Sequence, residues 1–287
     1  MRQSEEHKVP PLDKPMRLSD YAGGIFNLIP SRKGMKKAID KDWVRINGKP
    51  ASTGNFISGG ETIELTVSEA KQRPEIDLNL EVIFEDDFLA VVNKPAGIEV
   101  SGNRKWTIEN ALKPNLKPSS QPDALIYPEA IHRLDYPTTG ALLIGKSRNA
   151  VSELNRMFSE REVAKTYLAV SIGEMQNSGT INADIDDKPS LSKFKVLETV
   201  SSERFGKLNL VELLPETGRR HQLRKHLASI DNPILGDKDY GIDGLILKGK
   251  GLYLHSLQLK FIHPFTNEEL LIKAPVPKKF LKLFPEF

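Results

Sequence analysis

The chain has 287 residues, 39% of them hydrophobic, and a formal net charge of +3. It is long enough for one large domain, or for a large and a small one, and so small a charge excess does not by itself indicate a nucleic-acid partner. The absence of cysteine excludes disulfides, cysteine-ligated zinc, iron–sulfur clusters and thiol catalysis.

The first 15 residues are polar and contain prolines, without the apolar stretch of a secretory signal. No later segment reaches the ~18 consecutive apolar residues of a membrane span. We therefore predict a flexible tail over residues 1–15 and a soluble, cytoplasmic protein without a membrane partner.

Residues 16–67 predict a small α/β domain with a basic helix. Met35, Ala38 and Ile39 have helical spacing, and a tight turn is predicted at Asn47-Gly48. Between residues 31 and 50 the chain holds seven Lys or Arg and two Asp. A solvated surface helix would explain this charge, and so would a phosphate-binding face. The candidate phosphate ligands are Arg32, Lys33, Lys36 and Lys37.

A polar linker is predicted over residues 68–79, and a larger domain over residues 80–287. Within that domain, strands are predicted at 80–87, 88–97, 163–173, 206–215, 252–262 and 269–275. An amphipathic pattern predicts a helix over 147–162, capped by Ser147. Strands outnumber helices and do not alternate regularly with them, which favours an α+β fold with a mixed or antiparallel sheet.

The sequence AIHRLDYPTTGALLIGKS, residues 130–147, places Asp135 at a polar bend before a buried strand. An Asx turn would explain an aspartate there. A rigid bend would also hold a catalytic carboxylate in one pose, and the neighbouring cations His132 and Arg133 would keep it ionised. The local sequence allows both interpretations.

Tyr167 lies on the predicted strand 163–173 and shares a face with Lys165. It could be an ordinary strand aromatic. An aromatic ring beside a cation could instead stack on a flat ligand such as a base.

Arg219, Arg220 and Arg224 begin the predicted helix that follows the turn PETG. Cations at a helix N-terminus oppose the macrodipole. Either they are solvated, or they meet an anion, which would be a carboxylate of the protein or a phosphate of a substrate. The spacing of His221 and His226 does not match a zinc-binding helix, and no metal site is predicted.

Five segments, in this order, resemble the RluA branch of RNA pseudouridine synthases over about residues 80–287: VVNKPAGIEV, HRLDYPTTGALLIGKS, AKTYLAV, LLPETGRRHQLRKHLASIDNPILGDKDYG and LYLHSLQLKFIHPFTNEELLIKAPVP. Thr139 stands where that family more often has Ser, and both supply a hydroxyl. The resemblance implies that a uridine is isomerised by breaking its N1–C1′ bond, turning the base and rejoining it through C5.

The resemblance also implies roles for particular residues. Asp135 matches the catalytic aspartate, which acts at C1′ through a covalent sugar adduct or a glycal intermediate. Tyr167 matches the active-site tyrosine that stacks on the base, and Arg224 the arginine that pairs with the aspartate. Arg133 is a candidate for splaying the RNA or filling the vacated stack. The other candidate substrate-binding residues of this domain are His132, Lys165, Arg219 and Arg220.

The segments SRKGMKKAI, VRINGKP and GGETIEL resemble the small α-L RNA-binding domain of some ribosomal proteins and tyrosyl-tRNA synthetases. The match departs at Asp42 or Trp43, where that family usually has Gly. It implies a large folded RNA as partner, which we expect to be large-subunit ribosomal RNA, with transfer RNA as the alternative.

Two other functions are considered. A non-catalytic RNA-binding or ribosome-assembly factor would be expected to have lost at least one of Asp135, Tyr167 and Arg224. A glycosidase needs two carboxylates that flank one bond, and these segments offer one. Isomerisation needs neither redox chemistry nor an external nucleophile, so we expect no cofactor. We also expect a monomer, because one protein per RNA site suffices.

Overall fold

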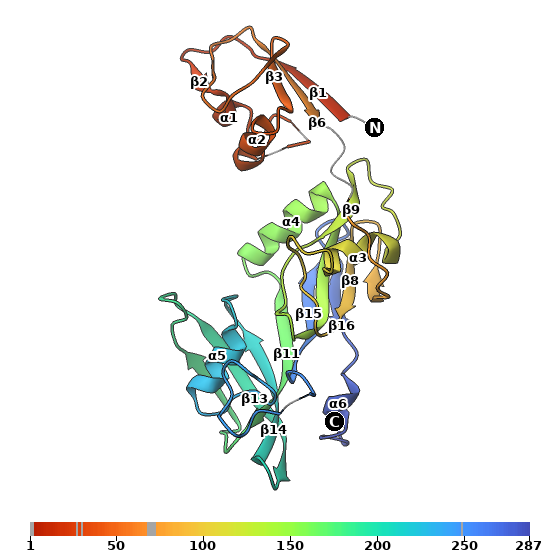
Figure 1. The fold of residues 1–287 in the computed structure, drawn as a ribbon, viewed down its shortest axis with the longest axis vertical. Coiled ribbons are helices and arrows are strands. Elements are labelled where there is room, and N and C mark those ends of the chain that lie inside the picture. The colour runs from red at the N-terminus through yellow and green to blue at the C-terminus, as the bar shows by residue number, and fades with distance from the viewer. Residues whose placement is uncertain (1–2, 27, 30, 68–72, 248) are drawn as a thin grey trace. The chain divides into compact units, whose positions relative to one another are not determined.

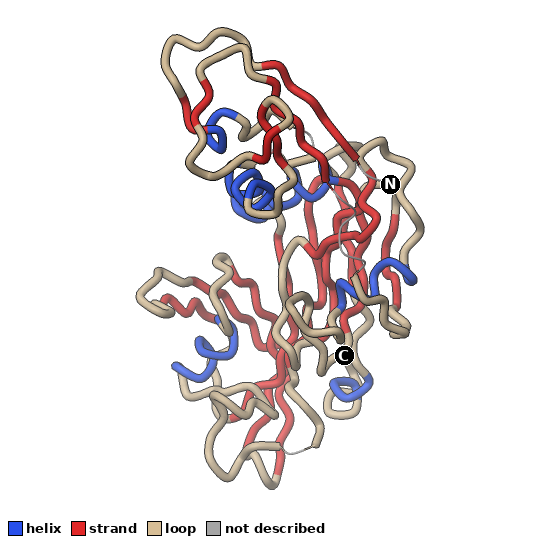
Figure 2. The backbone as a smooth tube through the Cα atoms, turned by 45° about the horizontal axis from the view of Figure 1, so that its top comes forward, coloured by secondary structure: helices blue, strands red, loops and turns tan. Residues whose placement is uncertain are grey.

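The computed structural model describes residues 3–26, 28–29, 31–67, 73–247 and 249–287. The chain divides into two compact units, Met1–Arg73 and Pro74–Phe287 (Figure 1). Strands make up most of the regular structure and the helices are short (Figure 2), which confirms the predicted α+β class. Among the described residues, no helix is both long and apolar enough to cross a membrane.

The N-terminal unit consists of short elements around a small core. They are β1 (Gln3–Lys8), β2 (Met16–Arg17), α1 (Leu18–Tyr21), α2 (Arg32–Ile39), β3 (Val44–Ile46), β4 (Lys49–Pro50), β5 (Phe56–Ile57) and β6 (Thr62–Val67). The main sheet has the order β1-β6-β3-β4, and β2 pairs with β5. Asn47 and Gly48 have positive φ angles of 49° and 76°, and they form the predicted tight turn between β3 and β4.

The prediction of a flexible tail is wrong for residues 3–8. These residues form β1, which pairs antiparallel with β6 from Gln3–Val67 to Lys8–Thr62. The segment QSEEHK has no apolar alternation because β1 is an edge strand, held by backbone pairing and by polar contacts such as the His7–Tyr21 hydrogen bond at 2.9 Å. Residues 1–2 lie outside the described residues.

The C-terminal unit is built on one large sheet. Its elements are β7 (Glu81–Glu85), β8 (Leu89–Lys94), α3 (Ile108–Asn115), β9 (Ala124–Ala130), β10 (Thr139–Ser147), α4 (Arg148–Ser159), β11 (Ala164–Ile172), β12 (Ser178–Asn182), β13 (Leu191–Ser202), β14 (Gly206–Pro215), α5 (Gln222–Ser229), β15 (Leu254–Ile262), β16 (Glu269–Lys273) and α6 (Lys278–Leu281). The strand order is β12-β13-β14-β11-β15-β10-β8-β7, with β16 on β15 and β9 on β10. The β10–β15 pair is parallel and the other strand pairs described in this sheet are antiparallel, so the sheet is mixed.

Both faces of the central strands are buried. On β8, Leu89 and Val91 belong to the cluster that includes α4, whereas Ala90 and Val92 belong to the cluster that includes α3. Strands covered on both faces are apolar throughout, which explains the uninterrupted run of β10. The predicted cap of α4 is confirmed, because the Ser147 hydroxyl accepts a hydrogen bond from the Ala150 amide at 3.2 Å. The half with α3 and α4 meets the half with α5 along β11 and β15 (Figure 1).

The predicted linker is partly core. The boundary between the units follows Arg73, and residues 68–72 lie outside the described residues. Ile76, however, is buried in the cluster around α3, and Leu78 packs against it. The Ile76 amide also donates a 3.2 Å hydrogen bond to the Asn110 carbonyl. The linker prediction is therefore wrong for this part, because two apolar residues among polar ones were too sparse to indicate burial.

Candidate active site

Asp135 lies on the loop between β9 and β10, at the edge of a pocket. Its backbone carbonyl accepts a 3.0 Å hydrogen bond from the Thr138 amide, which closes a tight turn. The Asp135 side chain is 19% exposed, so the carboxylate faces the pocket while its backbone is fixed. The turn is closed by the backbone carbonyl and not by the carboxylate, so it is a β-turn that holds Asp135 rigidly while its carboxylate faces the pocket.

Lys94, at the end of β8, anchors the Asp135 loop from below. Its side chain is completely buried, and its ammonium donates to the carbonyls of Thr138 at 2.8 Å, Pro95 at 2.9 Å and Tyr136 at 3.3 Å. Burial lowers the pKa of Lys94 to about 8, against the opposing effect of the Asp135 charge. The ammonium thus connects the end of β8 to the loop that carries Asp135.

Gly140 fixes the start of β10 directly after this loop. It pairs with Ser256 of β15 and has a φ of +109°. A β-carbon there would lie 2.2 Å from the Ser256 carbonyl oxygen, so only glycine fits. The neighbouring Thr139 hydroxyl is 2.8 Å from Nδ1 of buried His255. The two contacts lock the strand that follows Asp135 onto β15.

Arg224, in the first turn of α5, faces Asp135 but is held by other carboxylates. Its Nε and Nη2 donate to buried Asp237 at 2.7 and 2.6 Å, and Nη2 also contacts Asp239 at 2.6 Å. The Tyr240 ring lies 4.9 Å from the guanidinium carbon. Nη1 points toward Asp135, with 3.9 Å between Nη1 and Oδ2. The bidentate pair fixes the plane of the guanidinium and leaves one nitrogen for the pocket.

His221 is a second group beside Asp135, and the sequence analysis considered it only as a metal ligand. Its Nε2 is 3.7 Å from Asp135 Oδ1, and its Nδ1 is 3.0 Å from the Tyr240 hydroxyl. His221 caps α5 in the left-handed conformation, with a φ of 55°. Burial lowers its pKa, with Arg224 and Arg220 acting in the same direction and Asp135 opposing them.

The segment before α5 is fastened by Gln222. The Gln222 carbonyl oxygen accepts from the Thr217 hydroxyl at 2.7 Å and from the Arg219 amide at 3.0 Å, and its amide nitrogen donates to Leu191 at 2.9 Å. The helix begins at Gln222, so Arg219 and Arg220 lie in the preceding turn. The prediction that these two arginines begin the helix is therefore wrong, because the left-handed conformation of His221 separates their turn from the helix.

Tyr167 and Lys165 both line the pocket, as their predicted shared face requires. A register shift against β15 between Thr166 and Tyr167 interrupts the regular pairing there. Burial raises the pKa of Tyr167 to about 12, although a hydrogen bond with Ser256 lowers it. Burial lowers the pKa of Lys165, and Arg161 acts in the same direction. At neutral pH the pocket therefore contains a protonated phenol.

His132 has a mainly structural position in the pocket wall. Its Nε2 accepts a 3.1 Å hydrogen bond from the Leu143 amide of β10, and its ring stacks on Phe158 at 4.8 Å between centroids. Burial lowers the pKa of His132 to about 3, and Lys165 lowers it further. His132 is uncharged at neutral pH, so the expectation that it helps to keep Asp135 ionised is wrong.

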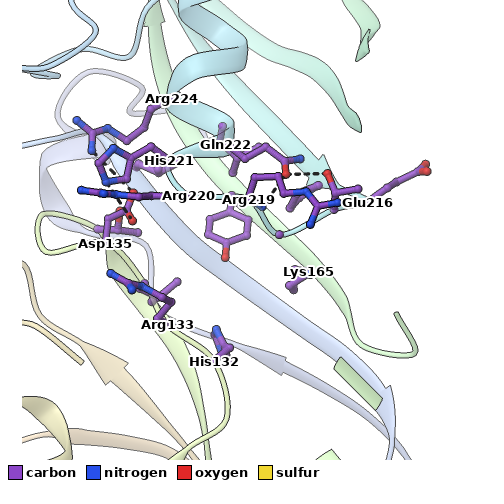
Figure 3. A pocket seen from close by; sticks show the side chains of 18 of the residues that line it. His132, Arg133, Asp135, Lys165, Glu216, Arg219, Arg220, His221, Gln222 and Arg224 are labelled. Carbon is purple, nitrogen blue, oxygen red and sulfur yellow. Dashed lines mark hydrogen bonds and ion pairs between the residues drawn. The ribbon is translucent and has the colours of Figure 1, made fainter. Parts of the chain in front are cut away.

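The pocket has a volume of about 570 Å³ and a positive lining. Its cations are Arg133, Arg161, Lys165, Arg219, Arg220 and Arg224, and its acids are Asp135 and Glu216. Figure 3 shows Arg224, His221 and Arg220 on one side of Asp135 and Arg133 on the other, while Glu216 points away. This volume is sufficient for one nucleotide-sized group, and the lining suits a polyanion.

The pocket brings together most of the candidates from the sequence: Asp135, Tyr167, Arg224, Arg133, His132, Lys165, Arg219 and Arg220. The other four, Arg32, Lys33, Lys36 and Lys37, lie on α2 of the N-terminal unit. Sequence reasoning missed Lys94, His221, Asp237 and Asp239 as neighbours of Asp135 or Arg224. For Asp237 the only signal was its place within the quoted segment GDKDYG. Its pairing with Arg224 could not be read from the sequence, because the two residues are 13 positions apart and a loop follows α5.

Comparisons with known proteins identify similar chains. A sequence model of the family described as RNA pseudouridylate synthase matches residues 88–229. The chain is 32% identical to ribosomal large subunit pseudouridine synthase D of Xanthomonas campestris pv. campestris, over 95% of this chain and 93% of that protein. It is also 32% identical to tRNA pseudouridine synthase C of Vibrio parahaemolyticus, over 73% of this chain and 96% of that protein. Among solved structures, human RNA pseudouridylate synthase domain containing 1 has the same fold, with a TM-score of 0.56 and 23% identity over 77% of this chain and 98% of that one.

Proposed function

This chain belongs to the RluA family of RNA pseudouridine synthases, and we propose that its substrate is large-subunit ribosomal RNA. The enzyme isomerises uridine: the N1–C1′ bond breaks, a C5–C1′ bond forms, C5 loses its proton, and N1 gains one. The substrate is supported by the name of the relative that matches nearly the whole chain. The match to a tRNA pseudouridine synthase makes transfer RNA the second candidate.

The observation that carries the proposed mechanism is the isolation of Asp135 among cations. We propose that its carboxylate acts at C1′, and both a covalent sugar adduct and a glycal intermediate require it ionised. Arg224 Nη1, 3.9 Å from Oδ2, is the positive partner of this carboxylate. His221 Nε2 lies 3.7 Å from Oδ1, but burial lowers the pKa of His221, so its ring is mainly neutral at neutral pH. Glu216, the other acid of the pocket lining, points away (Figure 3) and is paired with Lys193 at 2.6 Å.

Tyr167 is proposed as the surface on which the uracil stacks. Its phenol stays protonated at neutral pH because its pKa is about 12. A neutral aromatic ring in a pocket lined with cations suits a flat, uncharged base. We propose that the Tyr167 oxygen relays the C5 proton: it takes up that proton as its own hydroxyl proton passes to water, so no free phenolate has to form.

RNA binding is proposed to use two basic surfaces. A target uridine must leave its stack, which costs a few kcal/mol and least in loops. The pocket cations Arg133, Lys165, Arg219 and Arg220 are proposed to bind the phosphates around the flipped nucleotide. The exposed lysines of α2 in the N-terminal unit are proposed to bind another part of the RNA.

We further propose that the enzyme works as a cytoplasmic monomer. All the groups assigned to the reaction come from one unit of one chain, so no second copy is needed. Size-exclusion chromatography with light scattering would test this, since a dimer at working concentrations would contradict it.

Tritium release tests the reaction and the substrate together. RNA labelled at uracil C5 would be supplied separately as an unmodified large-subunit ribosomal transcript and as unmodified bulk transfer RNA, with Asp135→Asn as the matched variant. We expect release from the ribosomal transcript, at least about 10³-fold slower in the variant, with RNA affinity within a few-fold. Release from transfer RNA alone would overturn the substrate, and equal loss of binding and turnover would overturn the role of Asp135.

A further inference from the structure

An exposed aromatic residue lies between cations in the loop before α3, outside the pocket. Trp106 is 57% exposed, and Arg104 and Lys105 beside it are exposed as well. Residues 101–106 contain no acid, although Arg104 is 3.5 Å from Glu99. A tryptophan left in water next to two cations is unusual, since such a ring is normally buried or in contact with a partner.

The backbone that carries Trp106 is fixed. The buried Asn110 side chain donates to the Lys105 carbonyl at 2.8 Å and to the Arg104 carbonyl at 3.4 Å. Thr107 is buried, accepts from the Asn110 amide at 3.3 Å, and bridges in parallel to Glu99. The loop therefore presents its ring from a rigid base, and little conformational entropy would be lost when the ring contacts a partner.

Direct backbone contacts connect this loop to the segment of Asp135. The Gly97 amide donates a 2.8 Å hydrogen bond to the carbonyl of Tyr136, and Glu99 follows two residues later. Chain geometry then limits the distance between Trp106 and Asp135 to about 25 Å. Tyr136 is exposed as well, so a second aromatic ring lies next to Asp135. These contacts belong to the β8–α3 and β9–β10 loops, whereas Arg224 and His221 approach Asp135 from the α5 segment (Figure 3).

We propose that Trp106, with Arg104 and Lys105, binds the RNA that flanks the target uridine by stacking on an unpaired base. This inference rests on the proposed function. Withdrawal of a uridine into the pocket leaves its neighbours without a stacking partner, and an indole ring within reach replaces one. The two cations neutralise the adjoining phosphates. Trp106 is not among the described residues that line the pocket, so it contributes to binding and not to chemistry.

Kinetics of tritium release from the large-subunit ribosomal transcript test the proposal. Trp106→Ala should raise KM roughly 5- to 100-fold, with kcat unchanged within about twofold. Trp106→Phe should restore most of the affinity because it keeps an aromatic face. Leu271→Ala, at an exposed residue of β16, is the matched control and should behave as the wild type. A KM within about twofold of the wild type in Trp106→Ala would overturn the proposal.

Fluorescence separates this proposal from the proposed function. The chain has two tryptophans, so Trp43→Phe leaves Trp106 as the single emitter. Adding the ribosomal or transfer RNA should quench its emission saturably, with the same midpoint as the anisotropy of labelled RNA. Unchanged emission at saturating RNA would overturn the stacking contact, even if turnover is normal. Quenching without tritium release would support the contact and contradict the proposed reaction, and an absence of binding to either RNA would overturn both.

Discussion

The two arginines on either side of Asp135 are held very differently. Arg224 is buried and makes three short hydrogen bonds to Asp237 and Asp239. Arg133 is exposed, and within the part of the chain that the structure describes its side chain has no hydrogen-bond or ion-pair partner. A fixed cation can orient a carboxylate before substrate arrives, whereas a free one can only act on something that enters the pocket. The comparison therefore separates two sides of the pocket. One is the prepared wall, formed by Arg224 with Asp237 and Asp239, and the other is the side of Arg133, which RNA completes when it binds.

Within the prepared wall, a substitution of Asp237 should cause the largest loss of stability and activity. Asp237→Asn removes the buried charged partner of Arg224 and leaves only exposed Asp239 paired with it, so we expect a loss of about 3 kcal/mol or more in the free energy of unfolding. For the fraction of the variant that is folded, kcat should also fall by at least about tenfold, because the plane of the Arg224 guanidinium is no longer fixed. Urea unfolding and tritium release measure the two effects.

Asp239→Asn is the matched control, since Asp239 contacts the same nitrogen but its side chain is 61% exposed. Its loss should be at most about 1 kcal/mol. Equal losses in the two variants would show that Asp237 has no special part in holding Arg224.

The buried ammonium of Lys94, which holds the Asp135 loop, should make the free energy of unfolding depend on pH. The unfolded chain keeps this proton up to about pH 10.5, whereas the folded chain loses it near pH 8 because burial lowers the pKa. Between these values the unfolded state binds more protons, so stability rises with pH. Relative to Lys94→Met, the wild type should gain up to about 3 kcal/mol in free energy of unfolding from about pH 8 to about pH 10.5, and nothing below pH 8.

Urea unfolding of both proteins at several pH values gives this difference. The comparison with Lys94→Met removes the contribution of Lys279, whose pKa burial also lowers to about 8. A difference that stays flat across the range would mean that the Lys94 ammonium keeps its proton in the folded protein.

Local sequence was sufficient to predict those elements whose conformation is determined within one short segment. Ser147 and the apolar face that follows it specify a capped helix, and Asn47-Gly48 specify a turn. The edge strand β1 could not be predicted, because its polar residues gain their order from pairing with β6, some 60 residues away. The segments quoted for the family resemblance gave most of the pocket. They did not give the Arg224–Asp237 pair or the buried Lys94, because such partners depend on how distant loops pack.

The second basic surface, on α2, can be tested by charge reversal. Ser31 caps this helix, and Lys33, Lys36 and Lys37 are exposed, whereas Arg32 is paired with Asp20. The three lysines are therefore better phosphate ligands than Arg32. Changing all three to Glu should weaken RNA binding about 10- to 100-fold and lower the slope of log K against log salt by about 2.

The control for α2 changes Lys273, Lys278 and Lys282 to Glu, since these lysines are exposed in the C-terminal unit and alter the net charge equally. If both triple variants bind RNA equally weakly, the effect is one of net charge and α2 is not a binding face.

Arg133 should give the smallest effect and the clearest contrast with Arg224. Because its side chain is exposed and unpaired among the described residues, Arg133→Ala should leave the free energy of unfolding within about 0.5 kcal/mol of the wild type. The value of kcat/KM should fall about 5- to 10-fold, because an arginine that fills a vacated stack contributes only when RNA is bound. Arg133→Lys should recover little, since an ammonium cannot stack as a planar guanidinium does. Arg204→Ala, at another exposed arginine, controls for loss of charge. Full recovery by lysine would reduce Arg133 to a phosphate contact, and a loss of stability would mean that Arg133, like Arg224, is part of the prepared wall.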